Sequence, residues 1–365
     1  MDRTSFLHIS HLSVGYAAGT RQKVVASGLN AQIKRGELVC LLGANGAGKS
    51  TLMRTLCGFQ PFFEGQISIM GKPIGSLSEK EVSRLVSVVL TDRIVVPNAT
   101  VYELVAYGRS PYTGILGRTN KKDQQIIEKA IDQCGIAHKK EALLSSISDG
   151  ERQKAFIAKA LAQDTPVIVL DEPTAFLDLP ARVEIIQLLR RVSSEAGKSV
   201  LLSTHDLDLA LQMADRLWLL HNNGPLITGS PEDLLLQNAF QTLFRNKGIE
   251  FDTKTGLFRV EYEHFYELPV KGHGFEYVLL RRAFARKGIK TTGMRENPEW
   301  WIEIGKNGKS GFHLYNNEKQ LLTGHSVERI VEQTINCIES GENNKLNFLN
   351  GNSFCNSQEI CRRLV

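Results

Sequence analysis

The chain has 365 residues, 44 basic Lys and Arg against 39 acidic Asp and Glu, and a formal net charge of +5. At roughly 150 residues per domain, this length predicts about two domains. Hydrophobic residues make up 42% of the chain and charged residues 23%, which is typical of a globular protein and excludes a fibrous or mostly disordered one. The small basic excess argues against a nucleic-acid partner.

The apolar runs of the sequence are short. None approaches the roughly 18 consecutive apolar residues of a membrane-spanning helix. The first residues show no basic region that leads into an apolar core, so we expect no secretion signal. Together these features predict a cytoplasmic chain.

The first 248 residues alternate apolar, β-branched runs with helical periodicity, the pattern of a parallel sheet flanked by helices. Turn and capping residues predict the helices: Asn120 begins one that Gly135 ends, Pro180 begins one that Gly197 ends, and Ser230 begins a third. This region is therefore predicted to be α/β. Its runs of buried-strand character are residues 38–42, 167–170, 200–203 and 217–220.

The composition of the sequence changes after about residue 245, where aromatic residues become frequent and the predicted helices and strands become shorter. Strands near 258–262 and 300–304 and helices near 275–287 and 327–339 predict a smaller α+β domain over residues 249–340. Residues 341–365 are Asn-rich and weakly patterned, so we expect a flexible tail.

A glycine-rich loop follows the first apolar run. Gly43 is followed by four residues and then by Gly48, Lys49 and Ser50, the spacing of a phosphate-binding loop, and a strand and a helix flank it as the motif requires. Backbone N–H groups of such a loop surround a phosphate, while Lys49 reaches the outer phosphates and Ser50 offers its hydroxyl to Mg²⁺. The alternative, an ordinary glycine-rich turn, is disfavoured by the flanks. The predicted nucleotide contacts are Gly43, Asn45, Gly46, Ala47, Gly48, Lys49, Ser50 and Thr51.

Two acids, Asp171 and Glu172, end the apolar run 167–170. Without other motifs, two acids after a strand would indicate a solvent-exposed turn. Beside a phosphate-binding loop, Asp171 is predicted to hold Mg²⁺ through water and Glu172 to polarise an attacking water. The pairing indicates hydrolysis of the nucleotide as well as binding.

These motifs resemble the ATP-binding cassette family, over about residues 4–245. Residues 147–153 are similar to the family's signature loop, residues 175–178 to its D-loop, and residues 203–206 to its switch-histidine segment. Tyr16 stands where the family stacks an aromatic ring on adenine. The resemblance implies catalytic roles for Lys49, Glu172, Asp178 and His205.

The resemblance also implies a P-loop NTPase cassette, with a mixed sheet core and a helical subdomain over about residues 92–165. It implies a homodimer that pairs head to tail around two ATP molecules, with Mg²⁺ as the metal cofactor. Ser148 and Gly150, at the start of a helix, would then contact the γ-phosphate of the partner subunit's nucleotide. An ordinary helix cap is the alternative for Ser148.

The sequence departs from the family pattern at two places. Thr91 aligns with a glutamine that touches Mg²⁺ and the attacking water; its shorter side chain would need a water or Asp92 to complete the contact. In the signature, Asp149 replaces a glycine and Glu151 a glutamine. Because Ser148 and Gly150 persist, we expect both acids to point away from the phosphate.

Residues 101–112 resemble one subgroup, the ATPases of importers for iron-siderophores, haem and cobalamin. That implies two copies of the chain beneath membrane permeases on the inner face of the membrane, with a substrate-binding protein as an indirect partner. The helical spacing of Val101, Leu104 and Val105 also fits an amphipathic helix packed on the core, and both interpretations can hold. The solute is not identified by the sequence.

Two other functions stay open. One is a cassette ATPase that is not engaged in transport, although a single P-loop and the lack of a heptad run disfavour its translation and chromosome types. The other is a cassette subunit with slow or regulated turnover, suggested by Thr91. Residues 249–340 are interpreted either as a regulatory or dimer-stabilising module or as a solubilising or permease-fitting domain.

Overall fold

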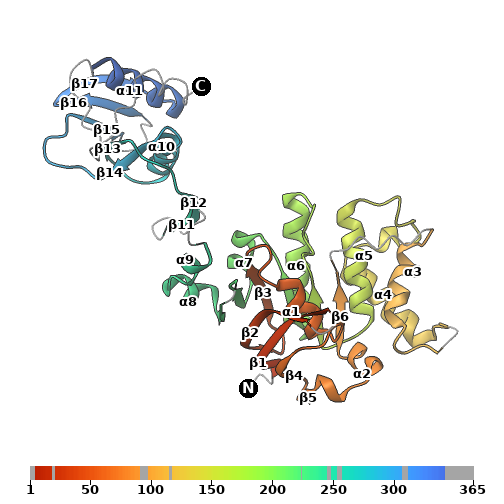
Figure 1. Cartoon of the computed structure of the whole chain (residues 1–365). Helices are drawn as coiled ribbons and strands as arrows, with labels where there is room; N and C mark the ends of the chain where they lie inside the picture. The colour runs from red at the N-terminus through yellow and green to blue at the C-terminus, as the bar shows by residue number, and fades with distance from the viewer. Residues whose placement is uncertain are drawn as a thin grey trace. The chain divides into compact units, whose positions relative to one another are not determined.

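The computed structural model (Figure 1) describes residues 5–18, 21–90, 98–114, 117–222, 224–244, 248–252, 257–305 and 311–341. The chain divides into two compact units, Met1–Arg245 and Asn246–Val365. Within the described ranges, no helix has the length and apolar character needed to cross a membrane.

A six-stranded sheet forms the centre of the first unit, in the order β10-β9-β3-β8-β7-β6. All neighbours are parallel except β10, which runs antiparallel to β9. The four predicted strands are confirmed to within one residue at each end, and their residues are almost all buried because both faces of the sheet are covered. The strands are β3 (Leu38–Gly43), β6 (Val86–Val89), β7 (Val167–Leu170), β8 (Ser199–Ser203), β9 (Arg216–Leu220) and β10 (Leu226–Gly229).

A second, antiparallel sheet packs on the first and was not anticipated from the sequence. Its order is β2-β1-β4-β5, and alternate apolar residues of its long strands, such as Leu7, Ile9 and Ile33, share one core with Leu41 and Val169 of the central sheet. The two sheets thereby enclose helix α1 (Lys49–Leu56) within the core. The strands are β1 (Ser5–Ala18), β2 (Arg21–Lys34), β4 (Glu64–Ile69) and β5 (Lys72–Pro73).

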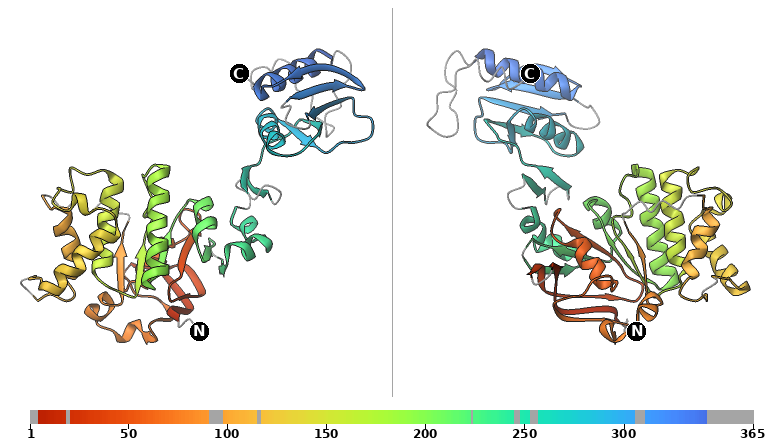
Figure 2. Two further views of the ribbon diagram at one scale, coloured as in Figure 1. Left: turned by 180° about the vertical axis from the view of Figure 1, so that it is seen from behind. Right: turned by 45° about the vertical axis from the view of Figure 1, so that its right-hand side comes forward.

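The chain between β6 and β7 is helical. Helices α3 (Val101–Ala106), α4 (Lys121–Gln133) and α5 (Asp149–Ala162) lie side by side in Figures 1 and 2. Within α3, Val101, Leu104 and Val105 are at most 2% exposed, as expected for a helix packed on a core. The short helix α2 (Glu79–Ser83) precedes β6.

A buried ion pair holds this helical group together. The Nε atom of Arg109 lies 2.9 Å from Oδ1 of Asp123, and both side chains are buried. Burial acts to raise the pKa of Asp123, but hydrogen bonds from the Asn120 N–H and from Arg109 outweigh it and lower the pKa. Breaking one partner would leave an unpaired buried charge, so the pair fixes how the 101–112 segment meets α4.

Capping residues bound the helices as predicted. Asn120 forms a capping box at the start of α4, Gly197 ends α6 (Leu179–Ala196) in the left-handed conformation, and Ser230 caps α8 (Pro231–Leu236). Helices α7 (Leu207–Met213) and α9 (Ala239–Phe244) complete the first unit.

The second unit has its own core. A five-stranded sheet, in the order β14-β13-β15-β16-β17, is covered on one face by α10 (Phe275–Ala285) and α11 (Val327–Gly341), which share a hydrophobic cluster with it (Figure 2). The helices near 275–287 and 327–339 and the strand 300–304 are present as predicted. The strands are β13 (Tyr266–Lys271), β14 (Ile289–Thr292), β15 (Trp300–Ile304), β16 (Phe312–Asn316) and β17 (Lys319–Gly324), and a hairpin of β11 (Ile249–Asp252) and β12 (Leu257–Val260) precedes them.

Candidate nucleotide-binding site

The glycine-rich loop joins the end of β3 to the start of α1. Gly43 has no room for a side chain, because a Cβ atom there would lie 2.7 Å from the carbonyl oxygen of Leu220. Gly48 has φ of +98°, and a Cβ atom on it would lie 2.5 Å from Cγ1 of Val25. Both glycines are therefore required by the backbone path of this loop.

Lys49, the first residue of α1, is only 6% exposed. Its Nζ donates hydrogen bonds to the carbonyl oxygens of Gly43, at 2.9 Å, and Ala44, at 3.4 Å. Burial lowers the pKa of Lys49, and the carboxylates of Glu172 and Asp171 act in the opposite direction. The ammonium thus lies between the loop and the two acids, where bound phosphates would replace the carbonyls as its partners.

Tyr16 lies beside the beginning of α1. Its hydroxyl shares a hydrogen bond of 2.5 Å with the Oγ1 atom of Thr51, which is itself buried. The tyrosine side chain is 50% exposed, so an aromatic ring is held at the edge of the loop with part of its surface open. Stacking of adenine on this ring stays a prediction.

Asp171 and Glu172 follow β7, next to the end of β8, because neighbouring parallel strands present their carboxyl ends at the same edge of the sheet. Glu172 adopts a left-handed backbone with φ of 50°, which few residues other than glycine tolerate. Its Oε1 atom lies 2.9 Å from Nε2 of His205, the predicted switch histidine. The structure therefore brings the predicted water activator and His205 into direct contact.

Ser203, the last residue of β8, connects the two acids and was missed as a site residue in the sequence. Its hydroxyl donates to Oδ1 of Asp171 at 2.6 Å and accepts the backbone N–H of Glu172 at 2.8 Å. The available signal was a polar residue at the end of a buried apolar strand, at the first position of the switch-histidine segment. Its role depends on β8 lying next to β7, which the sequence pattern does not specify.

The signature segment caps helix α5 at Ser148. The Ser148 hydroxyl donates to Oε2 of Glu151 at 3.0 Å, and the Ser148 N–H donates to the same oxygen at 2.9 Å. As the third helical residue, Glu151 turns back to Ser148 and completes a capping box. Where its carboxylate lies relative to a γ-phosphate stays a prediction. Asp149 pairs with Arg152 at 3.0 Å.

The other carboxylate oxygen of Glu151 faces basic side chains. Its Oε1 atom lies 3.4 Å from Nζ of Lys139 and 3.6 Å from Nε2 of His138. The hydrogen bond from the Ser148 N–H is the main cause that lowers the pKa of Glu151. The hydroxyl that is predicted to contact a γ-phosphate is thus already hydrogen-bonded to a carboxylate.

The D-loop residue Asp178 caps helix α6, accepting the backbone N–H of Ala181 at 3.0 Å. Gly150, predicted to act with Ser148, lies near the same helix, since a Cβ atom on it would be 3.5 Å from Cβ of Ala181. The exposed apolar residues Phe176 and Leu179 flank Asp178 in sequence and are 75% and 64% exposed. Thr91, the predicted partner of Mg²⁺, lies outside the described residues.

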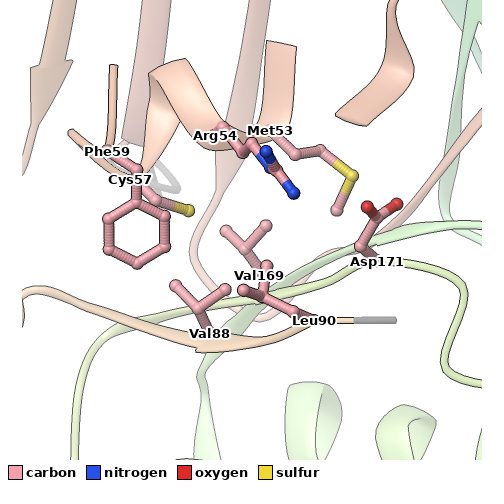
Figure 3. Close-up of a pocket in the computed structure, with 8 residues that line it drawn as sticks. All are labelled: Met53, Arg54, Cys57, Phe59, Val88, Leu90, Val169 and Asp171. Atoms are coloured by element: carbon pink, nitrogen blue, oxygen red, sulfur yellow. The ribbon is translucent and has the colours of Figure 1, made fainter. Parts of the chain in front are cut away.

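A small pocket opens beside Asp171 (Figure 3). Figure 3 shows Met53 and Asp171 at one side of it and Cys57 with the exposed Phe59 at the other. The remaining lining residues are Arg54, Val88, Leu90 and Val169. The pocket therefore reaches from the end of α1 to the predicted metal partner.

The first unit matches known proteins over most of its length. The ABC transporter family profile matches residues 26–175. An uncharacterized ABC transporter ATP-binding protein of Methanocaldococcus jannaschii is 37% identical over 255 residues, 70% of this chain and 87% of that protein. The petrobactin import ATP-binding protein FpuC of Bacillus anthracis is 37% identical over 248 residues, 68% of this chain and 89% of FpuC. The iron(3+)-hydroxamate import ATP-binding protein FhuC of Bacillus subtilis is 33% identical over 239 residues, 66% of this chain and 87% of FhuC.

A solved structure has the same fold. A transporter assigned to the metal-chelate type, in an inward-facing conformation, gives a TM-score of 0.58 at 25% identity, over 66% of this chain and 89% of that chain. These matches confirm the predicted P-loop NTPase fold of the first unit and the predicted family. The chain belongs to the ATP-binding cassette transporter family and is an ATPase.

Proposed function

We propose that this chain is the ATP-hydrolysing subunit of an importer for an iron(III)-siderophore, haem or cobalamin. Two of the similar proteins are named for import of petrobactin and of iron(3+)-hydroxamates, and the similar solved structure is of metal-chelate type. Residues 101–112 carry the subgroup's sequence pattern. The main observation in support of hydrolysis is the 2.9 Å contact between Glu172 and His205.

Hydrolysis would follow from the roles of these side chains. Glu172 polarises the attacking water, and His205, with a proton on Nε2, donates to Glu172 and orients its carboxylate. Lys49 leaves the carbonyls of Gly43 and Ala44 to neutralise charge on the outer phosphates. These positions need no movement of the central strands, only exchange of hydrogen-bond partners.

The residues at the loop fit a magnesium ion that is shared with phosphates. Asp171 and the hydroxyl of Ser50 offer hard oxygen ligands, as Mg²⁺ prefers. No group of three or more His, Cys, Asp or Glu within the described ranges could hold a metal alone, which suits an ion that keeps water and phosphate ligands. Bound Mg²⁺ would supply charge neutralisation between the β- and γ-phosphates.

The active form would be a homodimer arranged head to tail. In that arrangement Ser148 and Gly150 of one copy, at the N-terminus of α5, face the γ-phosphate held by the Lys49 loop of the other copy. The exposed Phe176 and Leu179, beside Asp178, would be covered in the same dimer. Closure would exclude water from both sites and complete the contacts to the phosphates.

The permease would meet the chain near the pocket of Figure 3 and residues 101–112. The exposed Phe59 offers an apolar contact there, and Asp171 lines the same pocket, so movement at this surface can reach the metal partner. This location agrees with a peripheral chain at the inner face of the cell membrane.

Transport can be tested in the native host by exchanging Glu172 for Gln. Uptake of radiolabelled ferric siderophore, haem or cobalamin should fall to background for one of these three solutes. The control Glu195→Gln, an exposed residue of α6, should keep normal uptake. Normal uptake of all three solutes by Glu172→Gln cells, with a soluble protein copurifying instead of a permease, would favour the cassette ATPase that is not engaged in transport.

A further inference from the structure

We propose that Ser203 is a positioning residue for ATP hydrolysis, which holds Asp171 and Glu172 in the arrangement that the reaction needs. The inference rests on the proposed roles of these two acids. Ser203 has no solvent exposure, and both of its hydrogen bonds are made to them.

The Ser203 hydroxyl donates one hydrogen bond and accepts another. The single proton is donated to Oδ1 of Asp171 at 2.6 Å, within the short range of charge-assisted bonds, and the oxygen accepts the N–H of Glu172 at 2.8 Å. This bond restrains the position of the Oδ1 atom. Ser203 therefore restrains the carboxylate that is proposed to hold Mg²⁺.

The second bond fixes the backbone of Glu172. With φ at 50°, this residue is in a region that persists only where the surroundings determine it. The bond from its N–H to Ser203 is one such constraint, and the turn that it holds directs the Glu172 side chain to His205. Loss of the hydroxyl would release both acids together.

The register of the strands explains why this position can act on both residues. β7 and β8 are parallel, and Leu170 is opposite Leu202, so the next residue of each strand, Asp171 and Ser203, emerges at the same edge. No apolar residue at the end of β8 could replace the two bonds.

The same strand offers a matched control. Ser199, at the other end of β8, is also fully buried, and its hydroxyl donates to the carbonyl oxygen of Lys34 at 2.8 Å. Ser199→Ala removes a buried hydrogen bond of the same strand without touching the acids. It measures the effect of a purely structural loss.

The test compares Ser203→Ala, Ser203→Thr and Ser199→Ala in the full chain. We expect Ser203→Ala to lower kcat by about 10- to 100-fold and to raise the Mg²⁺ concentration for half-maximal activity by a similar factor, as residues supporting metal ligands do. Fluorescence titration with mant-ATP should show unchanged affinity in EDTA and a loss of the gain in affinity that Mg²⁺ produces. Ser203→Thr keeps the hydroxyl, so it should retain much of the wild-type kcat and of the wild-type Mg²⁺ dependence.

Thermal unfolding separates positioning from folding. If Ser203→Ala and Ser199→Ala lower Tm equally but only Ser203→Ala changes the Mg²⁺ dependence, the proposal holds. Equal kcat and equal Mg²⁺ dependence for the two variants would overturn it. An inactive wild-type chain, or a Glu172→Gln variant with full activity, would instead contradict the proposed function on which it rests.

Discussion

At the scale of single residues, the site depends on side chains from separate segments that meet at one edge of the central sheet. Glu172 contacts His205, while Lys49 holds the carbonyls of its own loop. Tyr16 reaches the same place from the antiparallel sheet, through its bond to Thr51. Under the proposed function, each of these contacts involves a group that bound nucleotide would also contact.

Two substitutions of Tyr16 distinguish the contribution of ring stacking to ATP binding from that of the hydroxyl's hydrogen bond. Tyr16→Ala should weaken ATP binding by roughly 5- to 150-fold, because stacking of a base on an aromatic side chain contributes about 1–3 kcal/mol. Tyr16→Phe should bind almost as tightly as the wild type, since it loses only the bond to Thr51. Isothermal titration with ATP measures both, and equal affinity of Tyr16→Ala and the wild type would remove the stacking role.

At the scale of elements, helix α5 begins with an acidic group, which is unusual for a helix that is proposed to face a phosphate. The carboxylate of Glu151 bonds to both the hydroxyl and the N–H of Ser148. In the proposed dimer, a γ-phosphate that approaches Ser148 would meet this negative charge, which opposes the attraction of the helix N-terminus. The arrangement would make formation of the ATP-bound dimer less favourable than a glutamine would.

Glu151→Gln should therefore strengthen ATP-driven dimerisation. An amide keeps the capping geometry but removes the charge, and we expect the ATP concentration for half-maximal dimer to fall at least about fivefold, equivalent to roughly 1 kcal/mol of repulsion. Light scattering in the Glu172→Gln background measures this without turnover. High salt should shrink the difference.

Asp149→Asn is the matched control, because it removes one negative charge from the same helix start and the Asp149 carboxylate pairs with Arg152. Its dimerisation should stay close to that of the parent. If both substitutions strengthened the dimer equally, net charge would explain the effect, and the contact of Glu151 with Ser148 would not.

Local motifs could be predicted from the sequence, while contacts between distant segments could not. The glycine-rich loop and the acids after β7 are continuous segments, so the spacing of their residues in the sequence largely determines their geometry. Ser203 reaches both acids because β8 pairs with β7. Glu151 turns toward Ser148 because its carboxylate caps helix α5 and does not extend into solvent. The long strands β1 and β2 were missed because register shifts interrupt their alternation.

At the scale of the whole molecule, two hydrophobic clusters of the described residues lie in different units and share no residue. One lies between the sheets of the first unit, and the other lies under α10 and α11. We propose that the domain boundary falls near residue 248 and that the second unit, over residues 249–340, regulates the ATPase or stabilises its dimer. Separate cores predict separate unfolding.

Scanning calorimetry of the Glu172→Gln chain should show two transitions. ATP with Mg²⁺ at about 100 times its Kd should stabilise the first unit by about 2.7 kcal/mol and raise its Tm by a few degrees. The second unit holds none of the predicted nucleotide contacts, so its transition should move only if this unit takes part in the ATP-bound dimer. A single transition that shifts as a whole would show that the units unfold together.

The central claim is a site shared between two copies of the chain, and mixing two inactive variants tests it most directly. Glu172→Gln removes the water activator of a copy's own site, while Ser148→Arg blocks the site of its partner. In a head-to-tail dimer of one variant with the other, one of the two sites is intact, so equal mixing before ATP is added should restore about a quarter of wild-type ATPase activity. ATPase activity that stays at the level of the separate variants would contradict a shared site.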